Sequence, residues 1–324
     1  MLNSKVVWSY GDLMRLSALY SQNLIAGQTV AFLIDPGPEY VGCMLACWRS
    51  HCTAMPLATM HPAAELIHYL EDSRCATVIT TSQYKGRLEE AMQSVATPPK
   101  LVVLDEDGLV GEGVREKLPA EVSVPSIPSE QDGCLILYTS GTTSKPKGVL
   151  HTQASVGAQM KCLMDAWGWE ASDSTVHCLP LHHIHGIVNI LLCALASRAK
   201  LMFPGKFDAA VVVDVLASGR CSVFMAVPTV YHKLLQSIKA KTSRDGLKES
   251  LRKSVRLMVC GSAALPLGVM MEWAECTGHC LLERYGMSEI GMALSNDLLG
   301  WRLPSCVGTP LPGVEVRIVS KEEG

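Results

Sequence analysis

The stretch Tyr138-Thr-Ser-Gly-Thr-Thr-Ser-Lys-Pro-Lys-Gly148 is the most informative part of the sequence. It follows Cys134-Leu-Ile-Leu-Tyr138, a short apolar run that predicts a buried strand. It leads into Val149-Leu-His-Thr-Gln153, after which an apolar-periodic helix is expected. Glycines let a backbone approach a ligand closely, while N–H groups, hydroxyls and ammonium groups bind phosphate oxygens. We therefore predict a polyphosphate-binding loop between a strand and a helix.

Two alternative interpretations of this loop are less favourable. The P-loop of NTPases requires Gly-Lys followed by Ser or Thr, whereas Gly148 is followed by Val149. A flexible polar surface turn is the other alternative, but two glycines, two lysines and a run of hydroxylated residues depart from the composition of an ordinary turn. Polyphosphate binding remains the favoured interpretation.

The stretch resembles the signature Tyr-Thr-Ser-Gly-Thr-Thr-x-Lys-Pro-Lys-Gly of the adenylate-forming superfamily of acyl-CoA synthetases, luciferases and peptide-synthetase adenylation domains. Ser144 stands where the family usually has glycine, and we expect only a modest effect on loop flexibility. The resemblance implies catalytic roles for Thr139 and Lys147. The loop residues that it assigns to ATP or AMP are Thr139, Ser140, Gly141, Thr142, Thr143 and Lys147.

The resemblance also implies an α/β fold, namely the large N-terminal domain of the adenylate-forming enzymes with mostly parallel sheets covered by helices. Residues 1–324 are expected to form this AMP-binding domain, incomplete at its C-terminal end, with internal subdomains at about 1–131 and 132–324. The family continues with a ribose-binding Asp, a hinge and a small C-terminal lid that carries the adenylation lysine, and we expect these to be missing. This chain alone is therefore expected to be impaired in adenylation.

The composition describes a well-buried globular protein. The chain has 324 residues, of which 48% are hydrophobic and 18% are charged. A formal net charge of −3, without a run of Lys or Arg, gives no electrostatic reason to expect nucleic acid or a membrane surface as partner. The 13 cysteines lack C-x-x-C pairs, which indicates a reducing compartment, either cytoplasm or mitochondrial matrix. The apolar run 187–196 is too short to span a bilayer.

Apolar runs and helical periodicity alternate along the chain and predict a mostly parallel sheet covered on both faces. Strands are predicted at 29–34, 54–57, 77–80, 101–104, 134–138, 175–179, 200–203, 223–226 and 257–260. Helices are predicted at 8–24, 40–48, 62–72, 152–167, 186–197, 207–218, 228–240 and 266–277. Residues 105–131 are predicted to form a polar, Pro-rich surface crossover, and 307–319 to form antiparallel strands.

A second motif lies in Leu281-Leu-Glu-Arg-Tyr-Gly-Met-Ser-Glu-Ile-Gly291, which predicts a strand that stops in a turn at Gly286. It resembles the Tyr-Gly-x-Thr-Glu motif of the family, with Ser288 in place of threonine. The resemblance implies that Tyr285 packs against adenine, Ser288 donates to the α-phosphate, and Glu289 holds Mg²⁺. One carboxylate suits Mg²⁺, which keeps phosphate oxygens and water as its other ligands. The alternative is that Glu289 caps a following helix.

Gly261-Ser-Ala-Ala264 resembles the family element that lies against adenine and ribose, where small residues let a flat base approach the backbone. The remaining residues that the resemblance assigns to the nucleotide are Gly261, Ser262, Ala263, Glu283, Tyr285, Gly286, Met287 and Ser288.

Arg284 is the main candidate for selecting the acid. An arginine on an otherwise apolar strand is costly to bury without a partner. A pair with Glu283 is the structural alternative, but adjacent residues on a strand point to opposite faces. The functional interpretation is a guanidinium that binds a second carboxylate of the substrate while the first is activated.

Pro180-Leu-His-His-Ile-His-Gly186 supplies a second indication about the acid. Its histidine spacing offers no i, i+4 pair and no nearby thiolate, so a zinc site is disfavoured. The segment resembles the Pro-x-x-His element of the superfamily, in which His183 stands by the acyl channel. His185 then favours a small polar acid over a fatty chain, although either histidine could be an ordinary interior residue.

Together these segments resemble the malonyl-CoA synthetase branch of the superfamily. The resemblance implies that malonate is activated with ATP and Mg²⁺ as malonyl-AMP and then transferred to CoA, and that the acid contacts Arg284, His183 and His185. Methylmalonate satisfies the same requirement for two carboxylates, and a longer or aromatic acid would fit if Arg284 turned away. A truncated, non-catalytic nucleotide-binding paralogue and a gene-model fragment without function are the rival interpretations.

Overall fold

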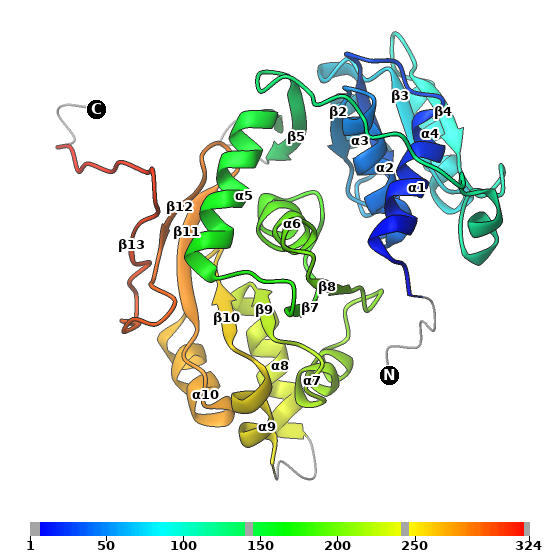
Figure 1. Ribbon diagram of the computed structural model, residues 1–324. Helices are drawn as coiled ribbons and strands as arrows, with labels where there is room; N and C mark the ends of the chain where they lie inside the picture. Colours follow the sequence, from blue (N-terminus) through cyan, green and yellow to red (C-terminus); the bar gives the residue numbers. More distant parts are fainter. Residues whose placement is uncertain (1–6, 140–144, 241–245, 321–324) are drawn as a thin grey trace. The chain divides into compact units, whose positions relative to one another are not determined.

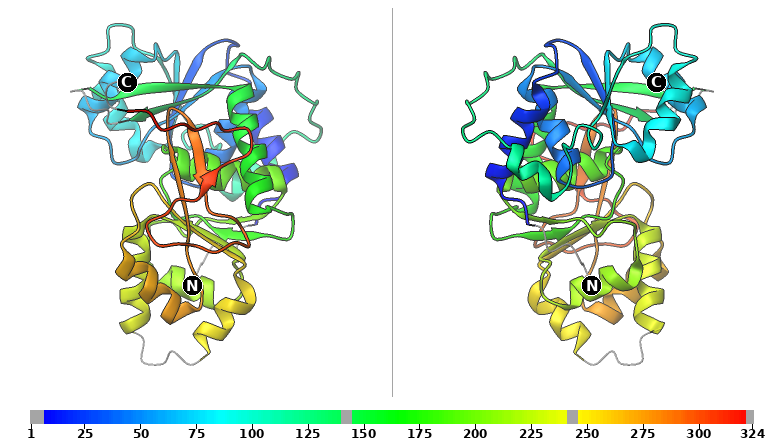
Figure 2. Two further views of the ribbon diagram at one scale, coloured as in Figure 1. Left: turned by 90° about the vertical axis from the view of Figure 1, so that its left-hand side faces the viewer. Right: turned by 90° about the vertical axis from the view of Figure 1, so that its right-hand side faces the viewer.

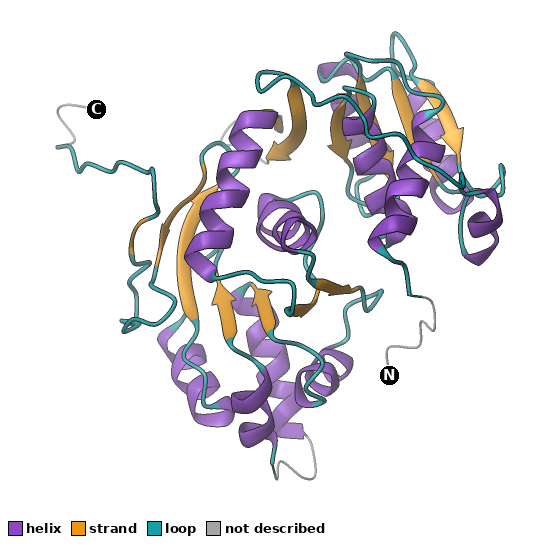
Figure 3. Ribbon diagram, viewed as in Figure 1, coloured by secondary structure: helices purple, strands orange, loops and turns teal. Residues whose placement is uncertain are grey.

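The computed structural model describes residues 7–139, 145–240 and 246–320 (Figure 1). The chain forms two compact units that are described here separately. The six-stranded unit combines Asn3–Gly157 with Pro180–Ile187, and the five-stranded unit combines Ala158–Leu179 with Val188–Gly324. Figure 3 distinguishes their strands from the helices that cover them.

The six-stranded unit is built on a sheet with the strand order β4-β3-β1-β2-β5-β6, in which only β6 is antiparallel to its neighbour. Its strands are β1 (Thr29–Leu33), β2 (Thr53–Pro56), β3 (Thr77–Thr80), β4 (Lys100–Val103), β5 (Gly133–Thr139) and β6 (Lys147–Thr152). Its helices are α1 (Tyr10–Ser21), α2 (Pro38–Arg49), α3 (Ala63–Asp72), α4 (Ser82–Met92) and the short 3₁₀ helix η1 (Glu112–Lys117). The alternation of strands and helices therefore predicted the architecture of this unit correctly.

Residues on the central strand β1 alternate between two helical layers. Ala31 and Leu33 belong to a buried cluster with residues of α3 and α4, which pack against each other. Phe32, between them, points to the opposite face, where its ring lies 4.9 Å from that of Tyr40 on α2. Both faces of the sheet are therefore covered, which explains why β1 is apolar at consecutive positions rather than at every second one.

The five-stranded unit contains the sheet β13-β12-β11-β10-β9 and the parallel pair β7-β8. Its strands are β7 (Ser174–Val176), β8 (Lys200–Met202), β9 (Val223–Ala226), β10 (Leu257–Cys260), β11 (Leu282–Met287), β12 (Gly291–Ser295) and β13 (Thr309–Pro310). Its helices are α6 (Cys193–Ser197), α7 (Ala209–Ala217), α8 (Pro228–Ala240), α9 (Leu247–Ser254) and α10 (Leu267–Thr277). Helix α8 packs against α7 and α10, and α9 packs against the same two helices (Figure 2). None of the helices in the described ranges has both the length and the apolar character needed to cross a bilayer.

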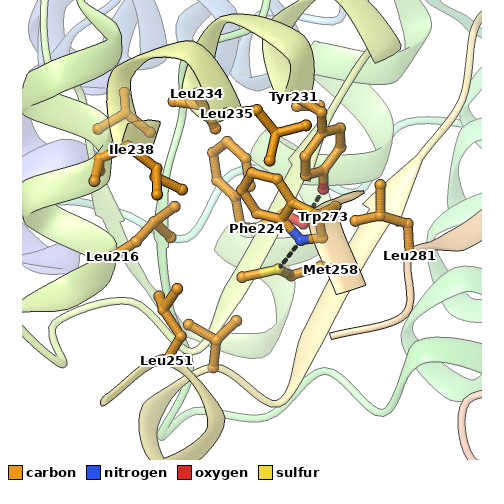
Figure 4. Packing of buried hydrophobic residues seen from close by; sticks show 14 of the residues in the cluster. Leu216, Phe224, Tyr231, Leu234, Leu235, Ile238, Leu251, Met258, Trp273 and Leu281 are labelled. Atoms are coloured by element: carbon orange, nitrogen blue, oxygen red, sulfur yellow. Dashed lines mark hydrogen bonds between the residues drawn. The ribbon is translucent and has the colours of Figure 1, made fainter. Parts of the chain in front are cut away.

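Aromatic side chains fill the core between β9, β10 and these helices (Figure 4). The Tyr231 ring lies 4.8 Å from the Trp273 ring and 5.7 Å from the Phe224 ring, in edge-to-face geometry. The buried polar atoms of this cluster are satisfied, because the Tyr231 hydroxyl donates to Val259 O at 2.9 Å and Trp273 Nε1 donates to Met258 Sδ at 3.1 Å. Strand β10 is therefore anchored by hydrogen bonds as well as by apolar contact.

A buried ion pair connects the beginning of β10 to the segment after helix α5 (Gln153–Trp167). Arg256 donates from Nε to Asp173 Oδ1 at 2.8 Å and from Nη1 to Trp167 O at 2.9 Å. Asp173 is almost completely buried, and it also accepts from the Ser222 hydroxyl at 2.7 Å. Because all these partners belong to the five-stranded unit, Arg256 fixes the start of the strand that leads to Gly261.

Several predicted elements differ from the structure around the glycine-rich stretch. A strand, β6, follows the loop where we predicted a direct entry into the helix, so the loop joins two antiparallel strands. The backbone of β6 pairs with that of β5 from Gly133↔Thr152 to Thr139↔Lys147. Because β5 also pairs with β2, the six-stranded unit includes the chain as far as Gly157, whereas the subdomain boundary was expected at 131/132.

Other differences concern elements with weak sequence signals. Helices α4 and α9 were not predicted, since both are short and polar on most of their surface, and η1 interrupts the predicted crossover at 105–131. The predicted helix at 186–197 consists of a π-helix, η2 (His185–Leu192), followed by α6. Of the predicted strands at 307–319, only β13 pairs with a neighbour, because β12 offers it an edge and no further strand in the described ranges reaches the rest.

Candidate active site

The glycine-rich loop connects β5 to β6 in the six-stranded unit. Thr139 ends β5, Lys147 begins β6, and the two residues are register partners. The Lys147 side chain is exposed. The predicted nucleotide-binding residues between them, Ser140, Gly141, Thr142 and Thr143, lie outside the described residues, as does Ser144. The structure therefore places both ends of the predicted phosphate loop at one end of a hairpin.

An aromatic support beneath this hairpin was not predicted from the sequence. Tyr138 donates its hydroxyl to Asp72 Oδ2 at 2.7 Å, and its ring lies 4.3 Å from the Tyr69 ring. A Cβ added at Gly148 would lie 3.0 Å from Tyr138 Cζ, so glycine at this position lets the ring cover the neighbouring strand. His68 donates from Nε2 to Pro146 O at 2.8 Å. These contacts hold the two strand ends that carry Thr139 and Lys147.

The histidine-rich segment also belongs to the six-stranded unit. His183 is exposed, whereas His185 is buried and begins the π-helix. The His182 ring lies 4.1 Å from the His183 ring and 5.4 Å from the ring of His61, which precedes α3. Burial, reinforced by these two neighbours, lowers the pKa of His182 to about 3, so this ring is neutral at physiological pH. Burial also lowers the pKa of His183, which disfavours a positive charge at this position as well.

In the five-stranded unit, the predicted adenine-binding element forms the turn between β10 and α10. Gly261 is buried, whereas Ser262 and Ala263 are exposed. Ser262 has a φ of 68°, a left-handed conformation that is uncommon for residues other than glycine, asparagine and aspartate. This turn therefore carries local backbone strain at a predicted binding residue.

The second motif occupies the hairpin of β11 and β12. Strand β11 continues through Gly286 to Met287, so the predicted stop at Gly286 is wrong. A Cβ at Gly286 would lie 2.3 Å from Gly291 O and 2.7 Å from Met292 Cα, because the two strands approach closely there. Ser288 and Glu289 lie in the turn that follows. Since Glu289 is followed by β12, the alternative that it caps a helix is also wrong.

Side chains of this hairpin that were assigned to the nucleotide or to its metal ion face solvent. Tyr285 is 48% exposed and Met287 is 42% exposed, and the Glu289 carboxylate is exposed as well. A register shift between Tyr285 and Gly286 marks a β-bulge, a feature that re-aims side chains and is frequent beside active sites. An exposed aromatic ring on β11, and a hydroxyl and a carboxylate in the turn that follows, therefore share one hairpin.

Gln159 of α5 supports the same hairpin and was missed by sequence reasoning. Its Oε1 accepts a hydrogen bond from Met292 N at 2.5 Å. It also occupies the space beside Gly291, where φ is 70° and an added Cβ would lie 1.8 Å from Gln159 Oε1. The only sequence signal was a glutamine within an amphipathic helix, which does not distinguish a solvent-facing residue from a structural one.

Arg284 is buried on β11, with 3% of its surface exposed. Its Nη2 donates to Ser262 Oγ at 3.3 Å, and its Nε is buried without a partner. Within the described ranges no carboxylate forms an ion pair with it. Glu283 does not pair with it, because that carboxylate accepts from Leu265 N at 3.3 Å. Burial lowers the pKa of Arg284 to about 10, an effect that the nearby Cys260 only partly opposes.

These features define a class of protein. A β-hairpin holds a Gly-, Thr- and Lys-rich loop, and a second hairpin presents an aromatic ring, a hydroxyl and a carboxylate. This combination is that of the large domain of an adenylate-forming enzyme. The chain belongs to the AMP-binding enzyme family, whose model matches residues 3–324.

Particular relatives support this membership and the predicted branch. The chain is 42% identical over 301 residues to the mitochondrial malonate–CoA ligase ACSF3 of Mus musculus, covering 91% of this chain and 51% of that protein. It is 37% identical over 319 residues to the malonate–CoA ligase of Arabidopsis thaliana, covering 92% and 51%. The ATP-bound crystal structure of MatB from Rhodopseudomonas palustris superposes with a TM-score of 0.85 at 31% identity, covering 98% and 62%.

The predicted fold and the resemblance to the malonyl-CoA synthetase branch are thereby confirmed. The chain spans about half the length of the curated relatives that it matches.

Proposed function

We propose that this chain provides the nucleotide-binding and acid-binding domain of an ATP-dependent ligase that converts malonate and CoA to malonyl-CoA, AMP and pyrophosphate. Two curated relatives are named malonate–CoA ligases, and the MatB structure contains ATP. A protein that also contains the regions of these relatives beyond the match would perform the complete reaction. Methylmalonate, a diacid of similar length, is the alternative substrate.

The observation that carries the choice of a diacid is the environment of Arg284. Moving a charge out of water costs several kcal/mol unless a partner compensates it, and Arg284 has no carboxylate partner among the described residues. A guanidinium binds a carboxylate through two parallel hydrogen bonds. One carboxylate of malonate would supply this partner, and the other would remain available for activation.

The first chemical step forms one bond and breaks one. An oxygen of the free carboxylate bonds to the α-phosphorus of ATP, the bond to the bridging oxygen of pyrophosphate breaks, and malonyl-AMP results. Positioning and charge stabilisation dominate such phosphoryl chemistry. We assign Thr139, Lys147 and the loop between them to the phosphates, Ser288 to the α-phosphate, and Tyr285 to the adenine.

Glu289 fits the expected magnesium ligand. Its carboxylate is exposed in the turn after β11, next to the Ser288 hydroxyl, so phosphate oxygens and water can complete the coordination. Bound Mg²⁺ would neutralise charge on the phosphates. In the second step the CoA sulfur bonds to the malonyl carbonyl carbon, the bond to AMP breaks, and the thiol proton passes to solvent.

Pyrophosphate exchange with alternative acids tests the proposal in a protein that also contains the regions of the relatives beyond the match. We expect exchange with malonate and methylmalonate to exceed exchange with acetate and octanoate. Arg284→Ala should abolish the advantage of the diacids, and Arg256→Ala serves as the control for loss of an arginine that is paired with a carboxylate in the same unit. Wild-type exchange that is as fast with acetate or octanoate as with malonate would show that the proposed substrate class is wrong.

We also propose a reducing compartment, either cytoplasm or mitochondrial matrix. Eight of the 13 cysteines are buried in apolar surroundings, and burial raises the pKa of Cys43 and Cys47 well above the ordinary value, which makes them unreactive core residues. The mouse relative is named as mitochondrial. Fractionation of cells that express the complete protein would decide between the two compartments.

A further inference from the structure

The Arg284 guanidinium occupies the space where a side chain at residue 261 would lie. The register pair Cys260↔Glu283 places Gly261 beside Arg284 on the neighbouring strand. A Cβ built on Gly261 would lie 2.6 Å from both Cζ and Nε of Arg284, and 2.9 Å from Nη1. Real Cβ atoms do not approach other heavy atoms so closely, so any side chain at this position would displace the guanidinium.

Ser262 fixes the same guanidinium from the turn. Its Oγ accepts the hydrogen bond from Arg284 Nη2 at 3.3 Å. Its φ of 68° is a conformation that glycine adopts without strain, whereas a serine there is strained. A residue that is unfavourable for the backbone but supplies a hydroxyl to a buried charge indicates that the hydroxyl has a role of its own.

We propose that Gly261 and Ser262 are positioning residues that set the location of the Arg284 guanidinium and thereby select short dicarboxylates. Ser262 holds Nη2, while Nε is buried and unpaired among the described residues. The inference rests on the proposed function, and it adds a second role to a turn that the family resemblance assigns to the nucleotide alone. Selectivity is then encoded by Gly261, Ser262 and Arg284 together.

The two roles of the turn predict different results. A residue that contacts only the nucleotide affects the binding of every acid to the same extent, so the ratio of affinities for malonate and propanoate does not change. A residue that positions Arg284 changes this ratio, because propanoate has the same number of carbons but lacks the second carboxylate. The affinity ratio of malonate to propanoate therefore distinguishes the two roles, whatever effect the variants have on nucleotide binding.

The test measures equilibrium binding of malonate and propanoate to this chain in the presence of AMP, by isothermal titration calorimetry. Ser262→Ala removes the hydroxyl and keeps the strain, whereas Ser262→Gly removes both. Both variants should lower the affinity ratio of malonate to propanoate about tenfold, the usual effect of one hydrogen bond to a charged group. Ser262→Gly should at the same time raise the melting temperature, so lost selectivity is not a consequence of lost stability.

A spectroscopic measurement accompanies the titration. The Nε–H resonance of Arg284, assigned by its absence in Arg284→Lys, should shift when malonate binds to the wild type and shift less in Ser262→Ala. Gly261→Ala, if folded, should lower the affinity ratio further than either serine variant because it displaces the whole guanidinium.

Two results would overturn the inference, and they can be told apart. If Arg284→Lys loses the preference for malonate while Ser262→Ala and Ser262→Gly retain the wild-type ratio, the positioning role is wrong and the proposed function stands. If the wild type itself shows no preference for malonate over propanoate, the proposed diacid specificity fails, and the positioning role fails with it.

Discussion

Replacement of Arg284 by methionine should stabilise the unliganded protein and abolish its response to malonate. Arg284 is a buried cation without a carboxylate partner among the described residues, and methionine fills a similar space with no charge. Exchange of a buried charged group for a well-packed apolar one is often neutral or stabilising. A stabilising effect at a binding residue would indicate that the native site is maintained for the ligand rather than for the fold.

The expected magnitude follows from three contributions. Burial lowers the pKa of Arg284 from its ordinary 12.5 to about 10, and a change of one in pKa corresponds to about 1.4 kcal/mol, so removal of the charge gains about 3 kcal/mol. Loss of the hydrogen bond to Ser262 costs about 1 kcal/mol. The space left by the shorter side chain costs about 1 kcal/mol. The net expectation is an increase of about 1 kcal/mol in the free energy of unfolding.

Arg256→Met is the matched control, because it removes a second arginine of the same unit that does have a carboxylate partner. The Asp173 side chain is 1% exposed and would be left as a buried charge without its cation. Removal of one member of a buried pair costs about 3–5 kcal/mol, and the 29% exposure of the Arg256 side chain favours the lower end of this range. We therefore expect changes of opposite sign from two formally identical substitutions.

Urea unfolding followed by tryptophan fluorescence measures both variants, since four of the six tryptophans lie in the five-stranded unit. Saturating malonate should raise the urea midpoint of the wild type and of Arg256→Met, but leave that of Arg284→Met unchanged. If Arg284→Met loses as much stability as Arg256→Met, the Arg284 guanidinium is compensated within the protein. The argument that it awaits a carboxylate of the substrate would then be refuted.

Two further predictions concern other supports of the site. The pKa of His182 is lowered to about 3 by burial and then by His183 and His61, so the folded state binds fewer protons than an unfolded state with a pKa near 6.5. The contribution of neutral His182 to the free energy of unfolding is therefore complete above pH 6.5 and declines as the pH falls, by about 1.4 kcal/mol at pH 5.5. His182→Phe should remove this contribution to the loss of stability between pH 7.5 and 5.5. Urea titrations that show the same loss of stability in His182→Phe as in the wild type would contradict the prediction. Gln159→Ala removes the hydrogen-bond acceptor of Met292 N. We therefore expect the Met292 amide to exchange with deuterium about tenfold faster in this variant than in the wild type. Equal exchange rates in the two proteins would show that Gln159 does not hold the hairpin.

Strong local patterns made much of the fold predictable. Strands β9 and β10 have the predicted bounds because Val223–Ala226 and Leu257–Cys260 are continuous apolar runs between polar segments, as buried parallel strands are. Strand β6 was missed because Lys147–Thr152 lacks a continuous apolar run and has no fully buried residue, as expected for an edge strand. The π-helix at His185–Leu192 has no periodicity that distinguishes it from an α-helix within so few residues.

Candidate site residues could be named from the sequence where a motif is contiguous, whereas supporting contacts between distant segments could not be predicted. Ser288 and Glu289 were identified from their neighbours in the sequence, and the structure places them in one exposed turn. The support of Tyr138 by Asp72, and of Met292 by Gln159, depends on helices that only the tertiary fold brings to the hairpins. A single sequence contains no local signal for such contacts, because exposed and structural polar residues on a helix surface look alike.

The position of Arg284 shows how the two kinds of information combine. Its charge was informative in the sequence because an arginine is costly to bury on a strand without a partner, but its geometry depends on β10, where the parallel register places Gly261 beside it. An arginine at 284 is compatible with this sheet only if residue 261 lacks a side chain, and its hydrogen bond requires an acceptor at residue 262. The proposed acid selection thus depends on the pairing of two neighbouring strands, so a change in either one alone should disturb it.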